Sequence, residues 1–166
     1  MSARRAARAS VVGGLMGGLI GAAVMSAGHA VITTIVGREP APAAAAQEED
    51  ATVKVADRLS RNVRGRPLDE NEKPAASHIV HYGFGAAMGL LYGAAAVAVP
   101  VATAGAGTGF GAAVWLGAHA IVVPALGLAR SPLQQPLSKE AIEFVLHIAY
   151  GLTVGLIRNA AVRISR

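Results

Sequence analysis

Apolar residues fill four long stretches of the chain, and polar residues are confined to two tails and to the connections between the stretches. No Asp, Glu, Lys or Arg occurs at residues 9–37 or at residues 75–129. A bilayer core requires about 20 consecutive apolar residues per helix. The pattern therefore predicts an all-α polytopic membrane protein. We expect a single membrane domain, residues 1–166, with transmembrane helices at residues 9–37, 77–99, 107–128 and 139–158.

The polar segments are two basic tails, residues 1–8 and 159–166, and one long polar loop, residues 38–76. Within that loop, residues 52–64 place Val53, Ala56, Leu59 and Val63 on one side of a helix and basic residues elsewhere around the turn. This pattern is typical of a short amphipathic helix that lies on lipid headgroups. A helix that is merely solvated is the alternative.

The N-terminal stretch also has features of a secretory signal. Its arginines precede an uncharged segment, and residues 28–30 form a small-x-small sequence. However, the uncharged segment is longer than the apolar part of a typical signal peptide. It is also similar to residues 107–127, which lie far from the N-terminus. We therefore expect a retained transmembrane helix.

Two pairs of stretches are similar to each other. HYGFGAAMGLL at residues 81–91 returns as HIAYGLTVGLI at residues 147–157. Residues 17–37 align without a gap on residues 107–127, with His29 matched to His119. This similarity predicts two tandem copies of a two-helix unit. Because each copy holds an even number of helices, the copies would be parallel, related by an axis along the membrane normal.

Glycines recur every four residues in all four stretches. Small residues allow membrane helices to approach closely, which is a principal source of helix association in lipid. The pattern predicts a compact helical bundle and a possible homo-oligomer, although a generally glycine-rich composition would also produce repeats. The predicted packing positions are Gly17, Gly21, Gly85, Gly89, Gly107, Gly111, Gly151 and Gly155.

Ionisable side chains near the long connections form a candidate proton or metal cluster. Helix direction places them in one half of the bundle, and such groups within membrane spans are candidates for function. Imidazole titrates near neutral pH and binds transition metals, so a proton-responsive site, a metal site and a haem site are all open. A structural role, with each imidazole bonded to water or to a backbone carbonyl, is the alternative. The residues are His29, His78, His81, His119, Glu143 and His147.

Composition narrows the class of function further. The formal net charge is +5, but the basic residues lie beside apolar stretches, which favours the lipid bilayer and its anionic headgroups as partners over nucleic acid. The chain has no cysteine and therefore no disulfide or thiolate metal site. No nucleophile elbow, phosphate loop or H-E-x-x-H motif is present. We expect no enzymatic activity and, as the simplest case, no cofactor.

Three segments carry a resemblance to a known group of proteins: HYGFGAAMGLLYG, GFGAAVWLGAHAIVVPALGL and HIAYGLTVGLIRN. The chain resembles, over residues 77–159, the YagU-like family of small uncharacterised bacterial inner-membrane proteins. The resemblance implies a polytopic protein of the bacterial inner (plasma) membrane. It implies no catalytic residue.

Orientation follows from the basic residues. The connections carry more Lys and Arg than the tails, but an N-terminal tail with three arginines and no acid resists translocation. We therefore expect both termini in the cytoplasm. The leading hypothesis is a membrane protein without enzymatic activity, a pH- or stress-responsive accessory factor. The alternatives are a small oligomeric channel or transporter and a histidine-ligated metal- or haem-binding subunit.

Overall fold

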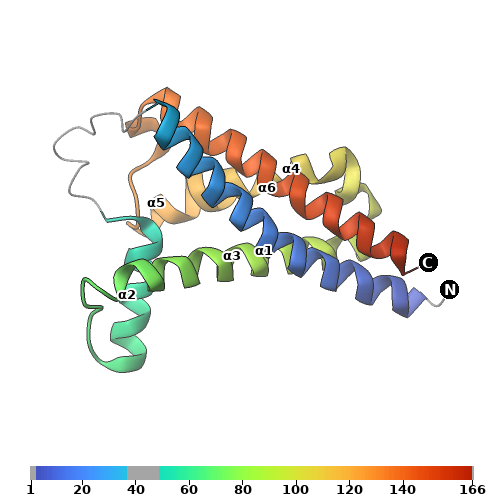
Figure 1. Ribbon diagram of the computed structural model, residues 1–166, viewed down its shortest axis with the longest axis horizontal. Helices are drawn as coiled ribbons and strands as arrows, with labels where there is room; N and C mark the ends of the chain where they lie inside the picture. The colour runs from blue at the N-terminus through green and yellow to red at the C-terminus, as the bar shows by residue number, and fades with distance from the viewer. Residues whose placement is uncertain (1–2, 37–48, 166) are drawn as a thin grey trace.

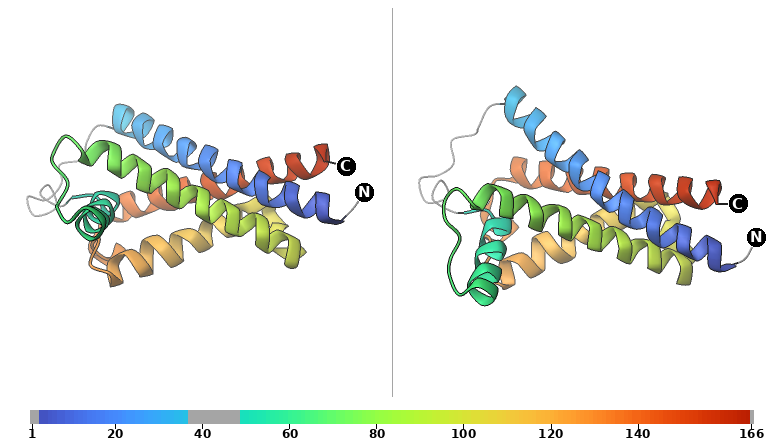
Figure 2. Two further views of the ribbon diagram at one scale, coloured as in Figure 1. Left: turned by 90° about the horizontal axis from the view of Figure 1, so that it is seen from below. Right: turned by 60° about the horizontal axis from the view of Figure 1, so that its bottom comes forward.

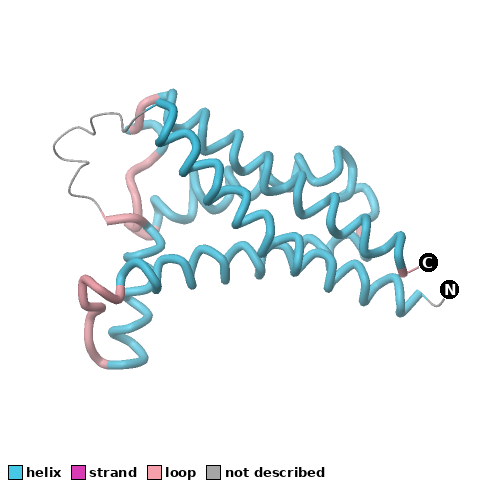
Figure 3. The backbone as a smooth tube through the Cα atoms, viewed as in Figure 1, coloured by secondary structure: helices cyan, strands magenta, loops and turns pink. Residues whose placement is uncertain are grey.

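The structure is a computed structural model that describes residues 3–36 and 49–165 (Figure 1). Residues 38–48 of the predicted polar loop, and the extreme ends of the two predicted tails, lie outside the described residues. The described part of the chain contains helices, turns and loops and no strand (Figure 3). The two chain ends lie at the same end of the molecule, as expected for an even number of crossings (Figure 1).

Within the described residues, four helices are long and apolar enough to cross a membrane, which confirms this part of the prediction. They are α1 (Ala3–Val36), α3 (Lys73–Ala98), a third span (Val101–Ala125) and α6 (Leu137–Ile164). Three of these helices extend into segments predicted as loop or tail. A fall in hydropathy marks the end of a membrane span, but it does not terminate a helix. The flanking segments contain no glycine that would terminate these helices. Pro74 even favours an early start of α3, because its fixed φ suits the first helical turn.

Helix α1 lies between α3 and α6 and presents a separate row of glycines to each neighbour. Gly14 and Gly18 face α3, where an added Cβ would overlap the carbonyl oxygens of Gly89 and Gly85, respectively. Residues on the adjacent row face α6: a Cβ on Gly17 would lie 2.9 Å from Cα of Val154. The one-residue offset between the rows turns them by about 100° around the helix. Helix α1 therefore contacts two neighbours at backbone distance.

The third span packs on α6 in the same way. A Cβ on Gly107 would overlap the carbonyl oxygen of Gly151 and lie 3.2 Å from Cα of Gly155. A Cβ on Gly111 would overlap the carbonyl oxygen of His147. All eight glycines named from the sequence thus lie against another helix, or against the turn that begins the third span, at distances that exclude a larger side chain.

The third span is irregular. It begins with the turn η1 (Pro100–Gly107), where Gly105 and Gly107 have positive φ, and continues as α4 (Thr108–Val114). A π-helix, η2 (Trp115–Val122), follows, and the span ends in α5 (Val123–Ala125). Pro124 lacks the N–H that an α-helix needs and so disturbs the hydrogen-bond ladder near the far end of the span. The regular ladder is already lost about two turns earlier, from Trp115.

Helix α2 (Ala51–Arg64) lies across one end of the bundle, roughly perpendicular to the long helices (Figures 1 and 2). Its small residues Ala56 and Ser60 are buried. The hydroxyl of Thr52 is 2.7 Å from that of Ser77 on α3, and both Nη atoms of Arg58 donate to the carbonyl oxygen of Leu126, each at 3.2 Å. Helix α2 therefore joins α3 to the end of the third span. It would lie parallel to a membrane that the bundle crosses.

The core is small and the outer surface is strongly apolar. Tyr92, Tyr150 and Val154 are almost completely buried in the middle of the bundle, and the Tyr150 hydroxyl donates to the carbonyl oxygen of Gly85 at 2.6 Å. Many large aliphatic side chains point outward, for example Ile20, Leu91 and Leu156. Soluble monomers rarely expose contiguous apolar surface on this scale. The outer surface is thus suited to lipid.

Candidate functional site

Six ionisable side chains gather at the end of the bundle that carries α2. We call this group the histidine end. Each long helix contributes at least one member, so the group joins the whole bundle. The residues are His29 from α1, His81 from α3, His119 from η2, and Glu140, Glu143 and His147 from α6.

The closest pair in this group joins the third span to α6. Nε2 of His119 lies 3.1 Å from Oε2 of Glu140. The Glu140 side chain is only 9% exposed, and it lies in the first turn of α6. The positive end of the helix dipole stabilises a carboxylate at that position. An imidazole that binds a proton here faces a negative group and forms a direct ion pair between two helices.

A second pair joins α1 to α6. Nε2 of His29 lies 3.6 Å from Oε2 of Glu143, one helical turn beyond Glu140. The His29 side chain is 44% exposed, so water reaches this pair more easily than the first. The separation is too long for a good hydrogen bond but permits an ion pair once the imidazole is protonated.

His147 lies between the two pairs. Its Nδ1 is 2.7 Å from the carbonyl oxygen of Glu143, which can only accept, so Nδ1 carries the proton and Nε2 remains an acceptor. The ring centroid of His147 is 5.7 Å from that of His119. His29, His81 and His119 are all close enough to interact with it electrostatically. Protonation of one of these imidazoles therefore opposes protonation of the next.

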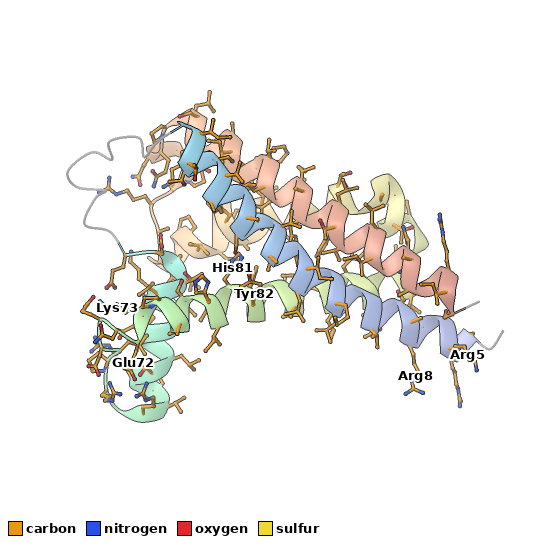
Figure 4. All side chains as sticks on the ribbon, viewed as in Figure 1. Arg5, Arg8, Glu72, Lys73, His81 and Tyr82 are labelled. Atoms are coloured by element: carbon orange, nitrogen blue, oxygen red, sulfur yellow. The ribbon has the colours of Figure 1, made fainter. Side chains whose placement is uncertain are left out.

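The two remaining predicted histidines, both on α3, have different environments. Nε2 of His81 lies 3.1 Å from the carbonyl oxygen of Ala22, so His81 bridges α3 and α1 (Figure 4). His78 is exposed, and its ring contact is with Tyr82, at 6.5 Å between centroids. The structure thus brings five of the six predicted residues to the histidine end and leaves His78 outside it. No three His, Asp or Glu side chains in the described residues converge as metal ligands.

Glu140 was not among the residues predicted for this site. The predicted start of the fourth helix, residue 139, placed Glu140 at the membrane surface, whereas α6 begins at Leu137 and the π-helix carries His119 against it. The available signal was spacing: Glu140 and Glu143 are three residues apart and therefore share a helix face.

A second buried polar group lies at the opposite end of the bundle, and it was also missed. The hydroxyl of Ser10 on α1 donates to the carbonyl oxygen of Gly93 on α3 at 2.7 Å. Nε of Arg158 on α6 donates to the same hydroxyl oxygen at 2.7 Å, and its Nη1 donates to Oδ1 of Asn159 at 3.0 Å. Arg158 therefore turns inward and joins three helices.

The loop before α3 is held by a set of ion pairs. Hydrogen bonds from the Arg66 guanidinium, the backbone N–H of Asp69 and the Arg64 guanidinium lower the pKa of Glu72 to about 2. The backbone N–H of Leu68 and the Arg61 guanidinium likewise lower the pKa of Asp57. These contacts fix α2 relative to the start of α3, on the solvent side of the histidine end.

Comparison with known proteins places the chain in a family. The model of a family described as protein of unknown function (DUF1440) matches residues 66–156. The chain belongs to this DUF1440 family. The match covers α3, the third span and most of α6, including every member of the histidine end except His29. No curated protein and no solved structure matches the chain.

Proposed function

We propose that this DUF1440 protein is a non-enzymatic, multi-pass membrane protein whose histidine end responds to protons at one membrane surface. The observation that carries this proposal is the pair His119–Glu140, with Nε2 and Oε2 3.1 Å apart and the carboxylate almost buried. The pair joins two helices that also meet through glycine contacts and through ring contacts such as Trp115–Phe144. A proton gained by His119 converts a hydrogen bond between these helices into an ion pair.

The charged and titratable neighbours determine how many protons the site can hold. His119 and His29 each face a carboxylate, so a proton on either is compensated. His147 faces other imidazoles and has no carboxylate within ion-pair distance in the described chain. The site can therefore hold two protons, one on His29 and one on His119, before repulsion between charged imidazoles exceeds the attraction of the carboxylates. The titratable groups of the site are His29 from α1, His81 from α3, His119 from η2, and Glu140, Glu143 and His147 from α6. Arg58 of α2 donates instead to the carbonyl oxygen of Leu126.

The membrane and its orientation are part of the proposal. The resemblance to YagU-like proteins supports the bacterial inner membrane, and the arginine-rich, acid-free N-terminal segment supports cytoplasmic termini. The histidine end would then lie on the outer face, where pH varies most. Anionic lipid headgroups, rather than nucleic acid, are the partner that the basic tails fit.

An internal duplication is supported by the glycine contacts, with one change to the gapless alignment. Gly18 meets Gly85 and Gly89 as Gly107 meets Gly151 and Gly155, so Gly107 corresponds to Gly18 and not to Gly17. His29 nevertheless corresponds to His119, which lies one residue further along the chain than the match of Gly18 with Gly107 implies. A π-helical turn accommodates one extra residue, and η2 begins after Gly107 and before His119. The π-helix thus accounts for the shift.

A second candidate function, an oligomeric channel or transporter, is favoured by the exposure of the third span. Only 11% of the apolar segment of the third span is buried, compared with 39% of the apolar segment of α1. This surface could be covered by another copy of the chain. Cross-linking in native membranes separates the candidates, because a strict monomer contradicts an oligomeric pore.

The proposed proton response can be measured as a distance between α1 and α6. The chain has no cysteine, so spin labels can be placed at Ile35→Cys and Leu137→Cys, both exposed at the histidine end. On acidification from about pH 7.5 to about 5.5, we expect the distance distribution to narrow, because His29 and Glu143 become an ion pair. Added Glu143→Gln should abolish the narrowing.

A matched label pair provides the control. Val12→Cys and Ile164→Cys are exposed at the opposite end of α1 and α6, away from the histidines. Their distance distribution should not change with pH. A response of equal size at both ends, or none at the histidine end, would contradict the proposed function.

A further inference from the structure

A groove lies between the N-terminal end of α1 and the C-terminal end of α3, at the end of the bundle opposite the histidines. Its volume is about 450 Å³, within the range of about 300–1,000 Å³ that small-molecule sites occupy. Its walls are aliphatic except for one arginine. The lining residues are Ala7, Arg8, Val11, Val12, Ala94 and Val97.

The groove results from the way the two helices meet. Gly93 lets α3 approach the backbone of α1 closely, because an added Cβ would overlap the carbonyl oxygen of Ser10. Beside that contact the small side chains of Ala7 and Ala94 leave space unfilled. The glycine row that faces α6, including Gly17, lies on the other side of α1. The groove therefore opens away from the bundle, toward lipid.

Arg8 stands at the boundary between the charged and the uncharged part of α1. Residues 9–37 have no charge, and residues 1–37 contain no acid. The Arg8 side chain is exposed and makes no ion pair within the part of the chain that the structure describes. Its guanidinium therefore lies at the level where the apolar core of a bilayer ends and phosphates begin. Guanidinium binds a phosphate through two parallel hydrogen bonds.

We propose that this groove binds one anionic phospholipid, with an acyl chain along Val11, Ala94 and Val97 and the phosphate on Arg8. Charge complementarity identifies the occupant: the walls match a hydrocarbon chain, and the only charged group on them is a cation. Arg5 lies one turn earlier on α1 and is exposed, but it does not line the groove. Figure 4 shows Arg5 and Arg8 at this end, away from His81.

The test uses the full chain in nanodiscs of phosphatidylcholine that contain a small fraction of phosphatidylglycerol with a photoreactive acyl chain. After irradiation, labelled peptides are mapped by mass spectrometry. We expect labelling to concentrate on the peptides that contain Val11–Val12 and Ala94–Val97. Arg8→Gln should reduce that labelling about tenfold, as expected for loss of one strong charge-assisted contact.

Two variants and one lipid make the test decisive. Arg5→Gln removes the same charge from the same helix and should leave labelling within about twofold of wild type. Ala94→Leu keeps Arg8 but fills the groove and should also reduce labelling. Equal effects of Arg8→Gln and Arg5→Gln would overturn the site and leave a diffuse electrostatic attraction. Equal labelling by a photoreactive phosphatidylcholine would overturn the requirement for an anionic headgroup.

Discussion

The two helix pairs, α1 with α3 and the third span with α6, meet through matching glycine contacts but differ in regularity. Helix α1 is unbroken over 34 residues, whereas the third span changes from α-helix to π-helix at Trp115. The glycine contacts come before the π-helix in the third span, so they are unaffected by it. The difference appears one to two turns later, where the histidines lie.

The irregular span has the tighter polar pair. His119 lies 3.1 Å from Glu140, whose side chain is 9% exposed, whereas His29 lies 3.6 Å from the more accessible Glu143. The wider π-helical turn places His119 on the side of the third span that faces α6, and it stacks Trp115 on His119 at 6.1 Å between ring centroids. The irregular backbone thus contains His119, the residue that we propose binds the proton. Single π-helical turns are frequent at functional sites.

The largest expected effect comes from breaking the contacts that the two pairs share. Gly89→Leu would drive a side chain into the backbone of α1, and Gly151→Leu would do the same at the start of the third span. We expect each to lower the free energy of unfolding by about 3 kcal/mol or more, measured by denaturation in mixed micelles.

Gly83 is the control for both substitutions because an added Cβ would meet nothing within 4 Å. Gly83→Leu should change the free energy of unfolding by less than about 0.5 kcal/mol. If Gly151→Leu changed the free energy of unfolding as little as Gly83→Leu does, the two helix pairs would not share a packing mode.

The next largest effect concerns the end of the bundle opposite the histidines, where Ser10 and Arg158 lie. Ser10→Ala removes the hydroxyl that joins α1 to both α3 and α6, and it leaves Nε of Arg158 without that acceptor. Unfolding in mixed micelles should become easier by about 1–3 kcal/mol. Ser138→Ala, at an exposed position of α6, is the matched substitution and should be neutral. A neutral Ser10→Ala would show that Arg158 bonds equally well elsewhere.

A smaller effect compares the two histidine–glutamate pairs directly. Glu140→Gln should reduce the stability at about pH 5.5 by about 1.5 kcal/mol, because it removes a nearly buried charged partner of His119. Glu143→Gln should cost less than about 1 kcal/mol, because the His29 pair is longer and more accessible. Thermal melting in nanodiscs at acidic and neutral pH measures both. The reverse order of effects would contradict the assigned roles of the two spans.

The smallest effect concerns α2 and the loop that joins it to α3. Within the part of the chain that the structure describes, no equivalent helix lies between the third span and α6. The pKa of Glu72 is lowered from 4.5 to about 2, so its ion pairs stabilise the fold fully above pH 4.5. That contribution is lost as the pH falls from 4.5 toward 2. Glu72→Gln should therefore weaken the attachment of α2 at neutral pH and change little at the acid limit. Protease cleavage near Arg64 measures the attachment, and cleavage that rises equally at both pH values would contradict this assignment.

Most of the architecture could be predicted from the sequence because it depends on local patterns. Uncharged length predicts the spans, and glycine spacing predicts close contacts. The two glycine registers of α1, at Gly13 and Gly14, even correspond to its two neighbours, α6 and α3. The helix ends at Lys73 and Ile164 were not predicted, because hydropathy reports where the membrane ends and not where the hydrogen-bond ladder ends.

The candidate site was only partly predictable. Helix direction indicated that His29, His119 and His147 lie in the same half of the bundle. The spacing of Glu140 and Glu143 indicates that they share a helix face, but the contact of Glu140 with His119 depends on a π-helical turn in a different span. The exclusion of His78 depends on the rotation of α3. Ser10 and Arg158 belong to different predicted helices, residues 9–37 and 139–158, and no local sequence pattern links them. Their bond joins residues 148 positions apart.

The proposed function depends most on proton binding at His119, and Trp115 reports on it directly. It is the single tryptophan of the chain, and its ring stacks on that of His119. A protonated imidazole quenches indole fluorescence more strongly than a neutral one. We predict that the emission of the protein in nanodiscs falls on acidification between about pH 8 and 5, that His119→Gln abolishes the change, and that His78→Gln does not. Emission that is independent of pH in the wild-type protein, or that titrates equally in His119→Gln, would contradict proton binding at His119.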